Sequence, residues 1–150
     1  MTQCKRQMRG TTVVELAFIL PFFLLLTLGA LHYGWLFYHL HRVTNAARHA
    51  ARVGTLVGRN EQDVKDTITT VLGLNEDKWP NYSLDVGNTR EVNIEYVPIM
   101  VDGGTVPGIR VGISLPTARN PHVLLIKKIP FGPLAPAYLA ASVTMAKEGG

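Results

Sequence analysis

The order of apolar and polar positions divides the chain into two parts. Residues 16–38 contain no Asp, Glu, Lys or Arg. At about 1.5 Å per helical residue, a run of this length crosses a hydrocarbon core of about 30 Å. The pattern therefore predicts one membrane-spanning helix near the N-terminus.

This helix is expected to continue beyond the apolar run. Small or apolar residues recur there at spacings of three and four, namely Val43, Ala46, Ala47, Ala50, Ala51 and Gly54. Such spacing gathers them on one helix face, and the opposite face carries Arg42, Asn45, Arg48, His49 and Arg52. We predict one helix from Thr11 to Leu56, whose distal half packs on an outer domain or on neighbouring subunits.

A second, shorter helix is predicted over residues 61–72. Asn60 is a suitable N-cap, and Glu61 and Asp63 place negative charge in the first turn. Val64, Ile68, Val71 and Leu72 would form its apolar face, and Gly73 would end it.

Beyond this helix the apolar period changes from 3.6 to two. Residues 92–96 and 109–115 alternate around the turn sequence Asp102-Gly103-Gly104, which predicts two antiparallel strands. Further strands are predicted at Tyr82–Val86 and at Leu139–Met145. Residues 116–136 contain five prolines and are expected to form mostly a surface loop. The predicted fold class is α+β, with two helices and a small antiparallel sheet.

The distribution of charge disfavours a nucleic-acid-binding protein. The formal net charge is +4, but Lys5, Arg6 and Arg9 stand in the first ten residues, ahead of the apolar run. The rest of the chain keeps an excess of only about +1, whereas a phosphate-binding surface needs its basic residues on the folded part. The leading basic residues are typical of a membrane-flanking segment.

The sequence offers no catalytic motif and no metal-binding or cofactor-binding motif. The single cysteine, Cys4, excludes an internal disulfide and a cysteine-based metal cluster. Paired histidines on the first helix are seven or eight residues apart, too far for one metal ion, so we expect helix-surface or interfacial side chains at His32, His39, His41 and His49. The alternation of the predicted strands places Asp85, Glu91 and Glu95 on the solvent side, so we expect them to be ordinary solvated side chains. We predict a protein that is not an enzyme and that needs no cofactor and no metal.

Basic residues without acidic neighbours follow the apolar run at Arg42, Arg48, Arg52 and Arg59. They could meet anionic lipid headgroups or the acidic surface of a partner. A plain solvated helix face explains them equally well.

Two residues at the mouth of the apolar run point to processing and assembly. Gly10 separates the basic leader from the apolar residues. Glu15 is an ionisable side chain at the edge of the apolar run, where burying a charge in the membrane costs free energy. The sequence RGTTVVELAFILP, Arg9 to Pro21, resembles the type IV prepilin processing site. This resemblance implies cleavage by a prepilin peptidase between Gly10 and Thr11, and pairing of Glu15 with the new amine of its own or a neighbouring subunit. Thr11 departs from the aromatic residue of many type IV pilins.

The resemblance extends through LHYGWLFYHLHRVTNAARHAARVGT, Leu31 to Thr55, which is similar to the TadE-like family of pilus-associated pseudopilins. It implies a minor pilin of a Tad-type pilus system that acts in pilus biogenesis and surface adhesion. The implied partners are a prepilin peptidase, other pilins, the assembly machinery and membrane lipid. The implied organisation is a leader at 1–10, a helix at 11–57 and an exported domain at 58–150. The implied location is the bacterial inner membrane, with the outer domain in the periplasm, or the cell surface or pilus after assembly.

Other residues of the first helix have expected structural roles. Pro21 frees the carbonyl of Ala17, so we predict a kink there. The aromatic residues at the far end of the apolar run, Tyr33, Trp35, Phe37 and Tyr38, would anchor the helix at the membrane interface or would serve as core aromatics.

One alternative function stays open from the sequence. The chain could be a permanently anchored single-pass protein that keeps its leader and whose outer domain binds a ligand or partner.

Overall fold

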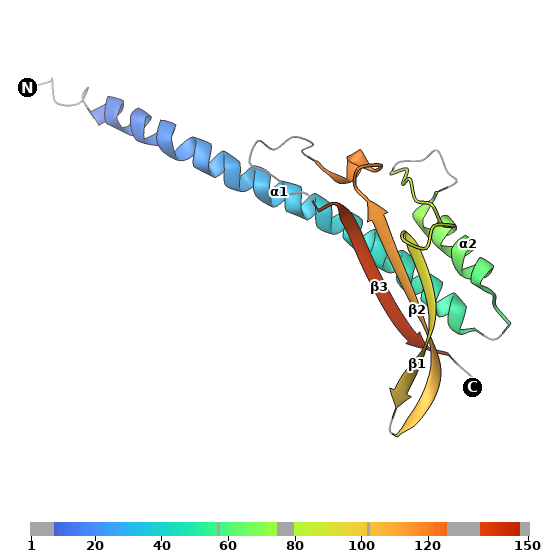
Figure 1. Ribbon diagram of the computed structural model, residues 1–150. Helices are drawn as coiled ribbons and strands as arrows, with labels where there is room; N and C mark the ends of the chain where they lie inside the picture. The colour runs from blue at the N-terminus through green and yellow to red at the C-terminus, as the bar shows by residue number, and fades with distance from the viewer. Residues whose placement is uncertain (1–7, 57, 75–79, 102, 126–135, 148–150) are drawn as a thin grey trace, which may run out of the picture.

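The protein is an α+β structure, as predicted, built on one long helix (Figure 1). The computed structural model describes residues 8–56, 58–74, 80–101, 103–125 and 136–147, with the backbone alone at 8–11. Its elements are α1 (Met8–Thr55), α2 (Glu61–Leu72), β1 (Val92–Val101), β2 (Gly104–Pro116), the 3₁₀ turn η1 (Pro121–Val123) and β3 (Tyr138–Ala146).

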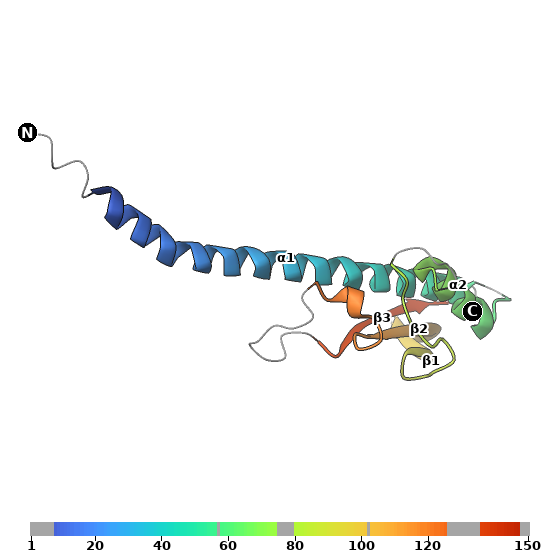
Figure 2. The same cartoon turned by 90° about the horizontal axis from the view of Figure 1, so that it is seen from above.

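α1 runs without interruption for 48 residues, about 72 Å at the usual helical rise. Its distal half lies along one face of the sheet, and its other half projects away from the body (Figures 1 and 2). The predicted small-residue stripe makes this contact, because Val43, Ala46, Ala47, Ala50 and Ala51 are all fully buried. Small side chains let the helix backbone approach the strands closely.

Gly54 shows how close that approach is. A Cβ atom at this position would collide with the Ile109 side chain of β2 and would lie 3.1 Å from Val64 of α2. Any side chain at this position would therefore force Ile109 and Val64 to shift where α1, α2 and the sheet converge.

α2 forms as the sequence predicts. The Asn60 backbone N–H donates to the Asp63 carboxylate at 2.9 Å, and Gly73 ends the helix with a positive φ of 68°. Val64, Ile68 and Leu72 form its buried face and join the core beneath α1.

The sheet is antiparallel with strand order β1-β2-β3, so β2 is central. Its inner face, which packs on the helices, is formed on β2 by Ile109, Val111, Ile113 and Leu115. The predicted pairing of residues 92–96 with 109–113 is confirmed, since Val92 lies opposite Ile113 and Tyr96 opposite Ile109. Gly103 takes the positive φ of the connecting turn, whereas Asp102 lies outside the described residues.

The predicted strand at Tyr82–Val86 is wrong. The backbone N–H of Ser83 donates to Asn120 Oδ1 at 2.7 Å, and that of Asp85 donates to Glu91 Oε2 at 2.9 Å. Because side chains satisfy these donors, the segment needs no neighbouring strand. Tyr82 is nevertheless buried at 2% exposure and belongs to the core.

The expectation of a surface loop over 116–136 is also wrong for its described beginning. Asn120 is fully buried and its Nδ2 donates to the carbonyl oxygens of Ser83 and Pro116 at 2.9 and 2.8 Å. Val123 of η1 is buried in the core as well. Val123 begins the apolar stretch Val123 to Ile126, around which the loop was expected, and it lies in the core, whereas residues 126–135 lie outside the described part.

Candidate functional site

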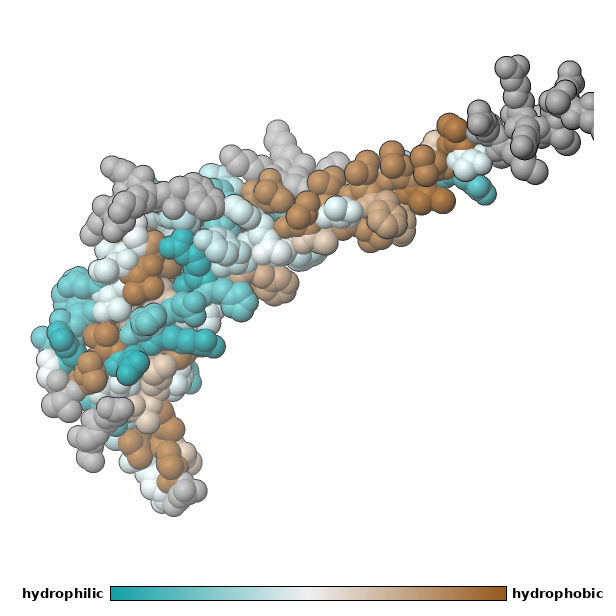
Figure 3. Space-filling model, turned by 180° about the vertical axis from the view of Figure 1, so that it is seen from behind, coloured by the Kyte–Doolittle hydropathy of each residue, from teal (hydrophilic) through white to brown (hydrophobic). Residues whose placement is uncertain are grey.

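The N-terminal half of α1 is exposed in the part of the chain that the structure describes. Residues 12–31 are exposed throughout except Gly29, which is half-buried, and Leu31 is still 57% exposed. The first fully covered residue is His32, at 3% exposure. These twenty positions span about 30 Å of helix, which equals the hydrocarbon thickness of a bilayer. In length and composition α1 fits a single-pass membrane anchor, and its uncovered half forms a continuous apolar surface (Figure 3).

The residues of the expected processing site lie at the start of this anchor. Gly10 and Thr11 belong to the first turn of α1, where the backbone alone is described. Glu15 is exposed one helical turn further along, on the uncovered half. Pro21 is inside the helix, and the N-terminal part of α1 curves (Figure 2).

The four aromatic residues at the end of the apolar run do not act as one group. Tyr33, Phe37 and Tyr38 are 47%, 57% and 45% exposed. Trp35 instead turns towards the body, where its Nε1 donates to the backbone carbonyl of His122 at 2.9 Å. Three of the four side chains are therefore exposed, and the fourth binds the outer domain.

Trp35 leads into a buried cluster that joins α1 to the outer domain. We call His39, Tyr82 and His122 the junction cluster. His39 Nδ1 and the Tyr82 hydroxyl are hydrogen-bonded at 2.7 Å. The His122 ring lies 5.8 Å from the His39 ring and 5.4 Å from the Tyr82 ring, between centroids. Residues from three separate segments thus meet at one point.

Burial controls protonation in the junction cluster. Loss of hydration lowers the pKa of His39 to about 4, and the nearby His122 and Arg42 lower it further. Burial also lowers the pKa of His122 and raises that of Tyr82 to about 12. All three side chains are therefore neutral at pH 7. The Nε2 atoms of both histidines are buried and find no hydrogen-bond partner among the residues that the structure describes.

The sequence-based placement of two histidines and one glutamate is corrected by this geometry. His32 and His39 are buried at 3% and 0% exposure, not on the helix surface, whereas His41 and His49 are exposed as expected. Glu91 is 8% exposed and pairs with Arg119, so it is not an ordinary solvated side chain.

The junction cluster was not predicted, because its members are distant in the sequence. His39 and Tyr82 are 43 residues apart. The crowding of histidines in residues 32–49 was the one available signal.

The basic residues after the apolar run also separate into different roles. The Arg42 guanidinium lies 5.5 Å from the centre of the Tyr82 ring, and Arg59 pairs with Asp63 at 3.5 Å. Arg48 and Arg52 are exposed on the face of α1 that points away from the sheet. Arg48 is about 25 Å beyond Leu31 along the helix, too far for the headgroups around an upright anchor. This distance argues against lipid headgroups for Arg48 and Arg52 and leaves a protein partner and a plain solvated helix face as the alternatives.

The arrangement is suited to anchoring and packing. Within the described ranges, no three His, Cys, Asp or Glu side chains gather as metal ligands would. The two features that the fold presents are the extended apolar helix and its buried junction with the outer domain.

One family model matches the chain. The model described as TadE-like protein matches residues 10–52, from the expected processing site through most of α1. The resemblance seen in the sequence is thereby confirmed for this segment. No curated protein and no solved structure matches the chain.

Proposed function

We propose that this chain, which carries a TadE-like segment at residues 10–52, is a minor pilin-like protein of a Tad-type pilus system. One observation carries the proposal: the matched segment begins at Gly10 and lies on an unbroken helix whose residues 12–31 are exposed, apart from half-buried Gly29, in the part of the chain that the structure describes. Such a half-helix suits a bilayer before assembly and neighbouring helices afterwards.

In this proposal a prepilin peptidase cuts between Gly10 and Thr11. The cut removes the basic leader and creates an amine one helical turn before Glu15. An amine and a carboxylate are each costly in hydrocarbon and less so together. Glu15 therefore favours a register in which it meets its own amine or that of a neighbouring subunit.

The proposed location is the bacterial inner membrane, with residues beyond 32 on the periplasmic side. The burial of His32 supports a membrane boundary at this point. The proposed partners of the protein are the peptidase, other pilins and the assembly machinery. Its proposed contribution to pilus biogenesis and adhesion is structural rather than enzymatic.

Two variants test the proposal separately at the cut and at the charge pair. Gly10→Leu is expected to block leader removal, visible as a slower-migrating form in membranes. Glu15→Gln is expected to leave membrane insertion and leader removal intact and to reduce surface fibres severalfold, with Glu15→Asp as the charge-retaining control. Normal maturation of Gly10→Leu would favour the permanently anchored alternative, and unchanged fibre counts in Glu15→Gln would remove Glu15 from assembly.

A further inference from the structure

The contact between α1 and the outer domain differs in chemistry along its length. Its distal end is the stripe from Val43 to Gly54, whose buried valine, alanine and glycine residues carry no group that takes up a proton. Its proximal end, nearer the membrane anchor, is the junction cluster, where η1 lies beside α1 (Figure 1). A fall in pH can therefore act on the proximal end and leave the distal end unchanged.

The proximal end contains histidine nitrogens that are buried without partners. In the part of the chain that the structure describes, each buried side-chain nitrogen or oxygen that lacks a hydrogen bond belongs to a histidine ring, namely both nitrogens of His32 and the Nε2 atoms of His39 and His122. Such atoms cost free energy while the contact is closed. Opening of the contact lets them bind water or a proton, so acid favours the open form.

The surroundings of His39 oppose a positive charge while the contact is closed. Tyr38 and Arg42 face its ring from α1, Tyr82 faces it from the segment before β1, and His122 faces it from η1. Arg42 is a cation, and a protonated His122 ring is another, with its centroid 5.8 Å from that of His39. No carboxylate of the described residues acts on His39 to balance these charges. Burial, and then these charges, lower the pKa of His39 to about 4, and burial also lowers the pKa of His122.

Tyr82 and His122 belong to one unit of the outer domain. Asn120 joins their two segments, because its Oδ1 accepts from the backbone N–H of Ser83 at 2.7 Å and its Nδ2 donates to the Ser83 carbonyl at 2.9 Å. This unit meets α1 through the junction cluster and through the bond of 2.9 Å from Trp35 Nε1 to the His122 carbonyl. The pairing of the three strands does not involve these bonds, so the unit can separate from α1 while the sheet stays paired.

We propose that the junction cluster is a pH-sensitive contact, in which proton uptake by His39 and His122 separates Tyr82 and η1 from α1 while the Val43–Gly54 stripe holds the domain on the helix. Opening exposes the Trp35 and His39 side chains and extends the uncovered part of α1 towards the stripe. Acid thereby changes how much of α1 is available to lipid or to neighbouring subunits. The change does not require removal of the leader, so it goes beyond the proposed pilin-like function.

Acrylamide quenching of Trp35 fluorescence tests the inference on the full chain in detergent. Trp79→Phe leaves Trp35 as the single tryptophan. We expect the accessibility of Trp35 to acrylamide to rise about twofold or more between pH 7 and pH 4.5. Each histidine that gains a proton on opening increases the ratio of open to closed form by up to about tenfold per pH unit, so two histidines increase it by up to about 100-fold.

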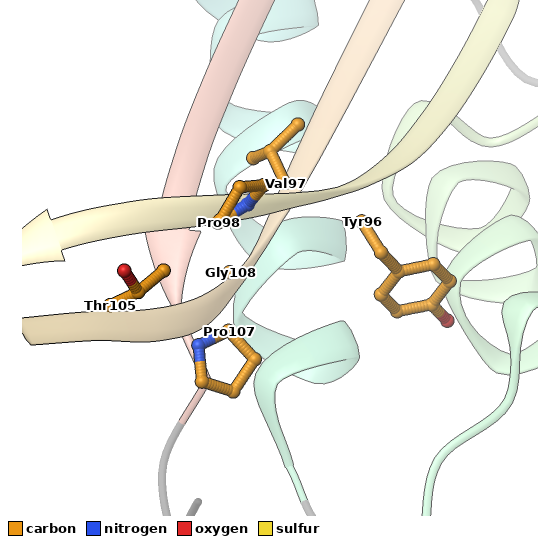
Figure 4. Close-up of a pocket in the computed structure, with 6 residues that line it drawn as sticks. All are labelled: Tyr96, Val97, Pro98, Thr105, Pro107 and Gly108. Carbon is orange, nitrogen blue, oxygen red and sulfur yellow. The ribbon is translucent and has the colours of Figure 1, made fainter.

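A second probe distinguishes local opening from unfolding of the domain. Its position is Thr105, in the hollow of the hairpin formed by β1 and β2 (Figure 4). The residues that line this hollow include no histidine and no charged residue. A dye attached to Thr105→Cys in a Cys4→Ser background is therefore expected to keep its emission down to pH 4.5, while Trp35 becomes accessible.

His122→Gln tests the role of the protons. The Nε2 atom of His122 has no hydrogen-bond partner among the described residues, so we expect this variant to fold. Its opening should become less steep, at up to about tenfold per pH unit, because one histidine remains. His41→Gln alters an exposed histidine and should keep the wild-type steepness. Constant accessibility of Trp35 down to pH 4.5, a simultaneous change of both probes, or equal steepness in wild type and His122→Gln would overturn the inference.

Discussion

The side chains of His39 and Tyr82 are hydrogen-bonded at 2.7 Å, and this bond fastens the outer domain to the helix just beyond the membrane anchor. His39 is fully buried and Tyr82 is 2% exposed. Because the bond is shielded from water, its loss leaves a buried polar atom without a partner. The pair therefore adds a buried polar contact to the packing of the Val43–Gly54 stripe on the outer domain.

Tyr82→Phe tests the importance of the pair. Removing the hydroxyl leaves His39 Nδ1 unsatisfied, and we expect the free energy of unfolding of the outer domain to fall by about 1–3 kcal/mol. Chemical denaturation in detergent, followed by tryptophan fluorescence, measures the change. Tyr96→Phe is the matched control, since Tyr96 is 61% exposed and should change stability by less than about 0.5 kcal/mol. Equal effects would show that the hydroxyl of Tyr82 contributes nothing specific.

The junction cluster also predicts a dependence of stability on pH. His39 is neutral when folded because burial lowers its pKa from 6.5 to about 4. Between these two values the unfolded chain binds the proton more readily, so stability is complete above pH 6.5 and declines as pH falls towards 4. His122, whose pKa is lowered in the same direction, adds to the decline.

Thermal unfolding measured from pH 7.5 to pH 4 checks this expectation. His39→Gln should flatten the profile, whereas His41→Gln, which alters an exposed histidine, should retain it. A wild-type profile that is level across this range would contradict the assignment of a buried neutral His39.

Gly54 gives a prediction about packing. Gly54→Leu forces a side chain into the space of Ile109 and Val64, and we expect a loss of about 1–3 kcal/mol or failure of the domain to fold. Gly34→Leu is the control on the same helix, because a Cβ there meets nothing within 4 Å. Limited proteolysis of the two variants in membranes compares them, and similar resistance would contradict the close contact of α1 with the sheet.

The sequence predicted correctly those helix and strand faces whose residues are brought together by the period of a single element. The stripe from Val43 to Gly54 identified the buried face of α1 because helical spacing alone places those residues together. The alternation at 109–115 identified the core strand for the same reason. These features need no information from distant parts of the chain.

Features that depend on distant partners were missed. Tyr82, Leu84 and Val86 alternate like a strand, but the backbone around them is bound by Asn120, 37 residues from Ser83, and by Glu91. His39 is buried because Tyr82 and His122 cover it. Neither partner is visible from the residues around His39.

The central claim is that peptide-bond cleavage after Gly10 produces the working form of this protein, with an amine close to Glu15. The intact mass of wild-type protein recovered from membranes tests it most directly. The account predicts a chain that starts at Thr11, without residues 1–10. A chain that retains those ten residues would contradict the pilin-like function and leave an anchored protein with an outer binding domain.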